Sequence, residues 1–255
     1  MDELRWGIVG PGGIARAVVP DFEHVEGCRV TAVGSRSLER AQTFAQEFGI
    51  ERAHGSYRAL IDDPDVDVLY IATPHPQHVA VAVAALEAGK AVLVEKSLTA
   101  TVEGAQTLIQ VAQEQQVFAM EAMWTRFQPA VVAARELVAD GAIGDVRTVQ
   151  ADLGVQRDFD AGDRLFSKEL GGGALLDLGV YAVAFSHLWL GRPTTVHEMP
   201  TNKPRPTLIR VIVKRYFETS CSICRTIALA LFLVPGPEIR LMTSTTKSLP
   251  NARRR

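Results

Sequence analysis

Apolar runs alternate with amphipathic stretches over the first half of the chain. Four short runs, rich in Val, Ile and Leu, predict buried strands over 4–9, 29–35, 66–73 and 91–95. The stretches between them have helical periodicity and predict helices over 38–48, 78–88 and 101–115. Because strand and helix alternate regularly, we expect the α/β class, with a doubly wound parallel sheet and right-handed crossovers.

The pattern changes beyond Met123. The predicted elements there are a helix, a strand and a second helix, over 130–139, 146–153 and 175–190. Three successive glycines precede the second helix, and strand and helix no longer alternate. We therefore expect a first domain over 1–122, followed over 123–197 by a partial α+β domain with an open sheet.

Charge separates a third segment. From Glu198 onward the chain holds 11 Lys and Arg residues against 3 acidic residues, whereas residues 1–197 hold 16 against 26. Prolines also cut this tail into short pieces. A shifted reading frame or a poorly folded end accounts for so abrupt a change, so we expect a divergent basic tail over 198–255.

The composition is that of a globular protein that handles small molecules. Hydrophobic residues make up 47% of the chain, and the net charge of −2 gives no electrostatic reason to expect nucleic acid or a membrane as partner. The N-terminus has no secretory signal, and no apolar stretch approaches the roughly 20 residues that cross a bilayer. Cys28, Cys221 and Cys224 are too few for a disulfide framework and favour the cytoplasm. No second cysteine pair completes a zinc set, so we expect no metal.

A cluster of glycines follows the first apolar run. Gly10 allows a tight turn, Gly12 lets the backbone approach a pyrophosphate, and Ala15 keeps the following helix close to the strand. Together with Gly13 and Ile14, these residues form a helix start whose free N–H groups and dipole attract phosphate. A second strand at the expected distance favours a dinucleotide site over an ordinary turn.

Ser35 and Arg36 stand where the second strand ends. A carboxylate at this place accepts hydrogen bonds from the ribose 2′-hydroxyl of NAD and repels a 2′-phosphate. This chain has a hydroxyl and a guanidinium instead, which suits the phosphate of NADP. We therefore expect NADP as the preferred cofactor, with NAD as the alternative. The other interpretation of Arg36 is a solvated surface charge.

A rigid loop follows the third apolar run. Thr73 and Pro74 lead into His75 and His78, and Pro74 with Pro76 forbids continuation of a strand or a helix. The two histidines have a spacing seen in metal sites, but no nearby Cys or carboxylate completes a ligand set. We expect these residues to line the cofactor cleft, with a simple helix start as the alternative role of His78.

Glu95 and Lys96 end the fourth apolar run, and we expect both to contact the cofactor. A lysine at this edge of a parallel sheet can donate to a substrate hydroxyl or lower the pKa of a neighbouring acid; the alternative is a surface lysine.

Asp177 and Tyr181 are four residues apart, so they share a face of an α-helix. A tyrosine needs a nearby cation to act as a base near neutral pH, and Lys96 is the candidate.

Six motifs stand at 5–9, 55–57, 75–78, 89–96, 120–127 and 172–181. Together they resemble the family of glucose-fructose oxidoreductase, inositol dehydrogenase and related NAD(P)-dependent oxidoreductases, in the branch of the dimeric dihydrodiol and NADP-linked xylose dehydrogenases. The resemblance implies a Rossmann domain, a substrate domain with an open antiparallel sheet, and a homodimer. It also implies catalytic roles for Lys96 and Tyr181, with Asp177 positioning the site.

The same resemblance places Trp124, Arg126 and Phe127 on the substrate side, with core packing at the domain junction as the alternative for the two aromatics. Two features depart from the family. Ser97 stands where the family has proline after the lysine, and the resemblance ends near residue 197. We expect an NADP-preferring oxidoreductase that acts on a sugar or on a cyclic or vicinal diol. The alternative, because of the tail, is a catalytically impaired dinucleotide-binding protein.

Overall fold

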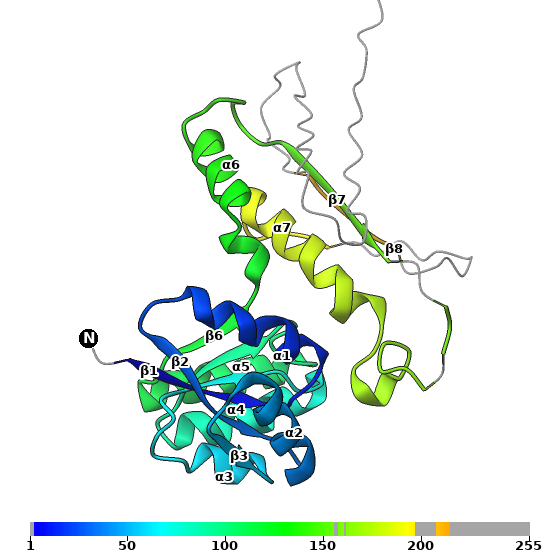
Figure 1. Cartoon of the computed structure of the whole chain (residues 1–255). Coiled ribbons are helices and arrows are strands. Elements are labelled where there is room, and N and C mark those ends of the chain that lie inside the picture. Colours follow the sequence, from blue (N-terminus) through cyan, green and yellow to red (C-terminus); the bar gives the residue numbers. More distant parts are fainter. Residues whose placement is uncertain (1–2, 156–157, 161, 197–207, 215–255) are drawn as a thin grey trace, which may run out of the picture. The chain divides into compact units, whose positions relative to one another are not determined.

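A computed structural model describes residues 3–155, 158–160, 162–196 and 208–214 (Figure 1). Within these residues the chain forms two compact units. The first contains the residues up to Met123 and the later segment 162–176, and the second contains 124–160 and the residues after Leu176. The chain thus leaves the first unit where the sequence pattern changes, and it returns there over 162–176, which the pattern does not indicate.

A six-stranded parallel sheet forms the centre of the first unit. Its strands are β1 (Leu4–Val9), β2 (Cys28–Gly34), β3 (Arg52–His54), β4 (Val68–Ile71), β5 (Ala91–Glu95) and β6 (Ala119–Ala122). They lie in the order β3-β2-β1-β4-β5-β6, and every neighbouring pair is parallel. The predicted doubly wound α/β sheet is confirmed. The two outer strands, β3 and β6, escape prediction because they are short and carry no run of β-branched residues.

Five helices accompany this sheet in the described residues. They are α1 (Gly13–Val18), α2 (Leu38–Phe48), α3 (Tyr57–Ile61), α4 (His78–Glu87) and α5 (Val102–Gln115), with short 3₁₀ turns at Val19–His24 and His75–Gln77. Hydroxyl side chains cap three of them. Ser37, Ser56 and Thr101 each accept a hydrogen bond from the backbone N–H three residues ahead, which fixes where α2, α3 and α5 begin.

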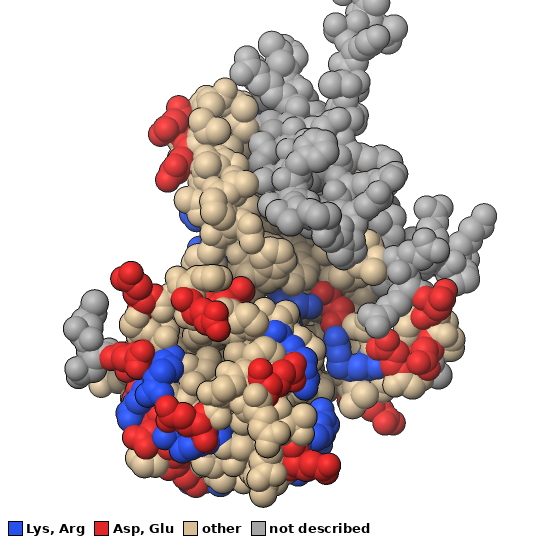
Figure 2. Space-filling model, in the orientation of Figure 1, with Lys and Arg blue, Asp and Glu red and all other residues tan. Residues whose placement is uncertain are grey.

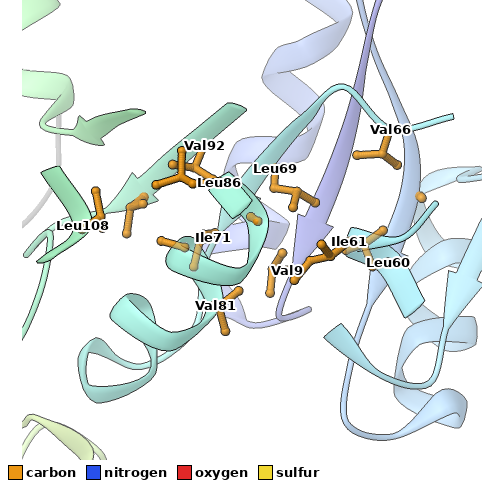
Figure 3. Close-up of a cluster of buried hydrophobic side chains, with 14 residues drawn as sticks. Val9, Leu60, Ile61, Val66, Leu69, Ile71, Val81, Leu86, Val92 and Leu108 are labelled. Carbon is orange, nitrogen blue, oxygen red and sulfur yellow. The ribbon is translucent and has the colours of Figure 1, made fainter. Parts of the chain in front are cut away.

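Helices cover both faces of the sheet because successive strand residues point to opposite sides. Val9 belongs to a cluster that includes residues of α3, α4 and α5, and Figure 3 shows this cluster with Leu69 and Ile71 at its centre. Ile8 and Tyr70 belong to the opposite cluster, which includes residues of α1 and α2. A strand that is buried on both faces is a continuous apolar run in the sequence, and this is why β1, β2, β4 and β5 could be predicted.

The second unit pairs β7 (Thr148–Gly154) with β8 (Leu208–Lys214) in an antiparallel ladder. Its helical elements are the 3₁₀ turn Trp124–Phe127, α6 (Pro129–Ala139) and α7 (Val180–Leu190). The π turn Leu175–Gly179 begins in the first unit and leads into α7. The α7 helix packs against both strands (Figure 1). Because β8 lies beyond residue 197, the tail does contribute to the sheet, and the expected boundary there is too early. The remainder of the tail, with Cys221 and Cys224, lies outside the described residues.

Two properties of the described residues bear on the expected partners. Figure 2 shows acidic and basic side chains interspersed over the visible face of the first unit, without a broad basic patch.

One segment, Lys168–Leu190, is long and apolar enough to cross a membrane, with a mean hydropathy of 1.4. A single segment of this kind is weak support for a membrane location, because core helices of soluble proteins share these properties.

An ion pair joins the starts of β1 and β4. The Asp67 carboxylate accepts hydrogen bonds from the Arg5 side chain at Nε (2.9 Å) and Nη2 (2.7 Å) and from the Arg5 backbone N–H (2.9 Å). The backbone N–H of Asp67 in turn donates to the Arg5 carbonyl at 2.8 Å. The side-chain hydrogen bond from Arg5 is the main reason that the pKa of Asp67 falls to about 2.

We expect Asp67→Asn to lower the free energy of unfolding at pH 7. The folded-state pKa lies below the unfolded value of about 3.9, so the stabilisation is complete above that value and is lost as the pH falls toward 2. Urea unfolding of both proteins at pH 7, 5 and 3 measures this. The difference in free energy of unfolding between wild type and Asp67→Asn is the same at pH 7 and pH 5. At pH 3 it falls to about half of that value.

Asp65→Asn is the matched control for this prediction. Asp65 accepts one hydrogen bond from Arg5, from Nη1 at 2.8 Å, and also pairs with Arg52 at 3.3 Å. Its side chain is 55% exposed, so removal of its charge changes the unfolding midpoint less. A gap between wild type and Asp67→Asn that stays constant down to pH 3 would contradict the assigned role of the charge.

Candidate active site

The strand order of the first unit reverses between β1 and β4, and the loops after these two strands meet at that place. Gly10, directly after β1, has a φ of +91°, and a Cβ built on it lies 3.2 Å from both the Ala72 carbonyl oxygen and Thr73 Cγ2. Only glycine suits this backbone conformation and this close approach. In open parallel sheets, ligands bind outside the carboxyl ends of the strands at such a reversal point.

Space remains open directly beside this turn. A Cβ built on Gly12 or Gly13 meets no atom within 4 Å, and Gly13 begins α1. The buried Oγ1 of Thr73 has no hydrogen-bond partner among the described residues. Ala15 is fully buried, as expected of the residue that packs the helix on the strand, whereas Ile14 is exposed. Free N–H groups, open space and an unused hydroxyl fit a phosphate-bearing dinucleotide.

The end of β2 lies next to that of β1. Ser35 is buried, and its Oγ accepts from the backbone N–H of Ser37 at 3.2 Å, which shapes the turn into α2. Arg36 is exposed in this turn, and within the described part of the chain its guanidinium forms no ion pair. Its charge is therefore available to an anion at this strand end.

The two loop histidines bind the backbone. His78 is fully buried, with Nε2 at 2.7 Å from the Thr73 carbonyl and Nδ1 at 3.0 Å from the Ser97 carbonyl. Burial lowers its pKa. His78 is the first residue of α4, as the alternative role predicts, and both its ring nitrogens face carbonyl oxygens; its contact with the cofactor stays a prediction. His78 joins the loop after β4 to the loop after β5.

His75 makes a similar bridge. Its Nε2 lies 3.1 Å from the Lys96 carbonyl, and its Nδ1 lies 3.3 Å from the carbonyl of Gly171, which belongs to the returning segment 162–176. A neutral imidazole carries one N–H, so it donates to one of these two oxygens at a time. His75 is buried, and Pro74 beside it is partly exposed.

Glu95 and Lys96 end β5 at the same edge of the sheet. The Glu95 carboxyl is buried, and burial is the main reason that its pKa is raised. Its Oε1 accepts a hydrogen bond of 2.5 Å from the Tyr70 hydroxyl, and its Oε2 accepts from the Lys96 backbone N–H at 3.2 Å. Sequence reasoning missed Tyr70, although a tyrosine within an otherwise aliphatic strand is a signal for a buried polar partner. The Lys96–Ser97 peptide bond is cis.

In the second unit, Trp124 and Tyr181 contact each other. The indole N–H of Trp124 donates to the Tyr181 hydroxyl oxygen at 2.9 Å, and the rings meet edge to face with centroids 6.1 Å apart. A donor to this oxygen stabilises the phenolate form. Trp124, Arg126 and Phe127 are exposed, and their assignment to the substrate side stays a prediction.

Asp177 lies buried in the π turn Leu175–Gly179, and Tyr181 is in the first turn of α7. Because Asp177 lies in the middle of the π turn and Tyr181 in α7, the sharing of one helix face, which rests on α-helical spacing, stays a prediction. Lys96 belongs to the first unit, whereas Asp177 and Tyr181 belong to the second.

Family comparisons cover most of the chain. Residues 4–123 match the oxidoreductase family with an NAD-binding Rossmann fold, and residues 131–220 match the GFO/IDH/MocA C-terminal domain. The second match passes residue 197, in agreement with the position of β8. The resemblance therefore extends further along the chain than the sequence motifs alone indicated.

Individual relatives give the same result. The chain is 44% identical over 194 residues to trans-1,2-dihydrobenzene-1,2-diol dehydrogenase of Mus musculus, a match that covers 74% of this chain and 56% of that one. The enzyme of the same name from Xenopus tropicalis is 37% identical over 237 residues, covering 88% of this chain and 70% of its own length. The chain thus spans little more than half of the mouse relative.

Solved structures agree. KijD10, a 3-ketoreductase from Actinomadura kijaniata in complex with NADP and TDP-benzene, matches with a TM-score of 0.68 and 35% identity, covering 74% of this chain and 58% of that one. The aldose-aldose oxidoreductase from Caulobacter crescentus, complexed with glycerol, matches with a TM-score of 0.69 and 32% identity over the same shares. The fold, the family matches and these relatives together show that the chain belongs to the GFO/IDH/MocA oxidoreductase family.

Proposed function

We propose that this protein is an NADP-preferring dehydrogenase that acts on a CH–OH group of a sugar or of a cyclic or vicinal diol. The observation that carries the proposal is the open space at Gly12 and Gly13, beside the turn at Gly10. It lies at the same edge of the sheet as Lys96, which follows β5. Relatives named for dihydrodiol and aldose oxidation support the substrate class. A homodimer and a cytoplasmic location belong to the same proposal.

The proposed mechanism assigns a role to each of four side chains. When bound, the nicotinamide nucleotide supplies the acceptor for the hydride that leaves the substrate carbon. Tyr181, as phenolate, takes the hydroxyl proton, so that alcohol becomes carbonyl. The indole N–H of Trp124, which lies 2.9 Å from the Tyr181 oxygen, stabilises this phenolate by donating a hydrogen bond. Lys96 donates a hydrogen bond to the substrate oxygen, and Asp177 positions the segment that carries Tyr181.

The proposed cofactor preference rests on Arg36. It is exposed at the end of β2, beside the buried Ser35, and no carboxylate stands at either position. A guanidinium binds a 2′-phosphate through charge-assisted hydrogen bonds, whereas a ribose hydroxyl gains little from it. The complex of KijD10 with NADP is a related case. We therefore assign the 2′-phosphate of NADP to Arg36 and Ser35.

A second candidate function is dinucleotide binding without turnover. It is favoured by the sheet of the second unit, which has two strands among the described residues. If the sheet held no strands besides these two, its strand edges would stay open. The two candidates differ in one measurement, because only the dehydrogenase reduces NADP when a panel of aldoses and trans-diols is offered.

We expect Arg36→Ala to weaken NADP binding about tenfold or more and to leave NAD binding nearly unchanged, because the lost charge-assisted hydrogen bonds go only to the 2′-phosphate. Calorimetric titration with both dinucleotides measures this. Gly12→Ala is the control, since its methyl group occupies the open space beside α1 and weakens both cofactors alike. An equal loss for NADP and NAD in Arg36→Ala would remove the argument from the 2′-phosphate.

We expect Tyr181→Phe to lower kcat by about 10²-fold to 10⁴-fold, since phenylalanine cannot exchange the substrate proton. The Kd for NADP stays the same, because the assigned cofactor residues lie in the first unit. Steady-state reduction of NADP on the aldose and trans-diol panel gives kcat, and calorimetry gives Kd. Activity that survives the substitution would exclude Tyr181 as the base. Binding without turnover by the wild-type protein would favour the second candidate function.

A further inference from the structure

The returning segment 162–176 packs closely on the loop after β4. A Cβ built on Gly171, whose φ is +72°, lies 2.9 Å from Pro76 Cδ and 3.1 Å from His75 Cβ. A Cβ built on Gly172 lies 2.3 Å from the Arg164 carbonyl oxygen, within the segment itself. No side chain fits at either position. The glycines therefore serve close packing of this segment on the first unit, beyond the helix entry that the sequence suggests.

Hydrogen bonds hold the same segment at its C-terminal end. The Ser97 hydroxyl donates to the Leu176 carbonyl at 3.0 Å, and these residues are 79 positions apart in sequence. Ser97 is buried, with 6% of its surface exposed. The contact between His75 Nδ1 and the Gly171 carbonyl is longer, at 3.3 Å. Ser97 is thus the firmer of the two donors.

The hydrogen bond of Ser97 joins the chain neighbours of two proposed site residues. It directly follows Lys96 in the chain, and its acceptor, Leu176, directly precedes Asp177 in the π turn. A residue without a hydroxyl, such as alanine or the proline of the family pattern, offers no donor to this carbonyl. The partly buried Leu176 oxygen then loses the hydrogen bond that the present chain provides.

We propose that Ser97 is a positioning residue of the reaction, which acts by fixing the Leu176 carbonyl and thereby the start of the π turn that carries Asp177. The proposal rests on the proposed dehydrogenase function, in which Lys96 and the segment after Leu176 take part together. Ser97 touches neither substrate nor cofactor in this role. It sets the conformation of the chain that leads from the first unit into Asp177 and Tyr181.

The test compares Ser97→Ala, Ser97→Thr and a control, Thr99→Val. Thr99 is also buried in the loop after β5, and its hydroxyl donates to the Thr101 carbonyl at 2.6 Å, so the control removes an equivalent hydrogen bond without touching the segment 162–176. Amide hydrogen exchange of the peptides that cover 162–176 is measured first, because it does not depend on activity. Exchange over α5 reports on the stability of the first unit as a whole.

We expect Ser97→Ala to speed exchange over 162–176 about fivefold, since loss of one hydrogen bond changes a local opening equilibrium by about that factor. Exchange over α5 stays unchanged. The same variant lowers kcat for NADP reduction about fivefold or more, with the Kd for NADP unchanged. Ser97→Thr, which keeps the hydroxyl, restores both quantities, and Thr99→Val alters neither.

Each other outcome overturns a defined part of the proposal. Unchanged exchange over 162–176 in Ser97→Ala shows that the hydroxyl does not hold the segment. Faster exchange with full kcat shows a structural role without positioning in catalysis. Absence of turnover in the wild-type protein overturns the proposed function and the catalytic half of this proposal, while the exchange data still decide whether Ser97 holds the segment.

Discussion

The close approach of two strand-end loops governs the first unit. Parallel strands β1 and β4 end side by side, and the turn at Gly10 leaves only 3.2 Å for a side-chain atom before the backbone of Ala72. The strand order reverses at this place, so the helices that follow the two strands cover opposite faces of the sheet. This arrangement leaves open space at Gly12 and Gly13, where α1 presents its free N–H groups.

Buried polar side chains hold the loops at this edge in a fixed arrangement. His78 links the carbonyls of Thr73 and Ser97, and Tyr70 holds the carboxyl of Glu95 at 2.5 Å. Each contact joins the loop or strand of β4 to that of β5. Because a buried polar atom is costly to leave unpaired, such bridges specify one loop geometry. The loop that carries Lys96 is therefore held in place by His78, Tyr70 and Glu95.

The second unit supplies a different kind of arrangement. Trp124 precedes α6, and Tyr181 lies on α7, yet the indole N–H of one meets the phenol oxygen of the other. The helix α7 in turn packs against a ladder whose second strand, β8, comes from the basic tail. The charge and the prolines of this tail suggested a break after residue 197, but the apolar run 208–214 between them retains strand chemistry.

By itself, the sequence determined the features that depend on neighbouring residues. The buried strands, the glycine turn after β1 and the helices α2, α4 and α5 follow from apolar periodicity and local backbone preferences. Tertiary structure decided the polar partners, because these join residues 57 positions apart for Trp124 and Tyr181, 79 for Ser97 and Leu176, and 96 for His75 and Gly171. A residue type states what a side chain can donate or accept, and only folding selects which distant atom lies within reach.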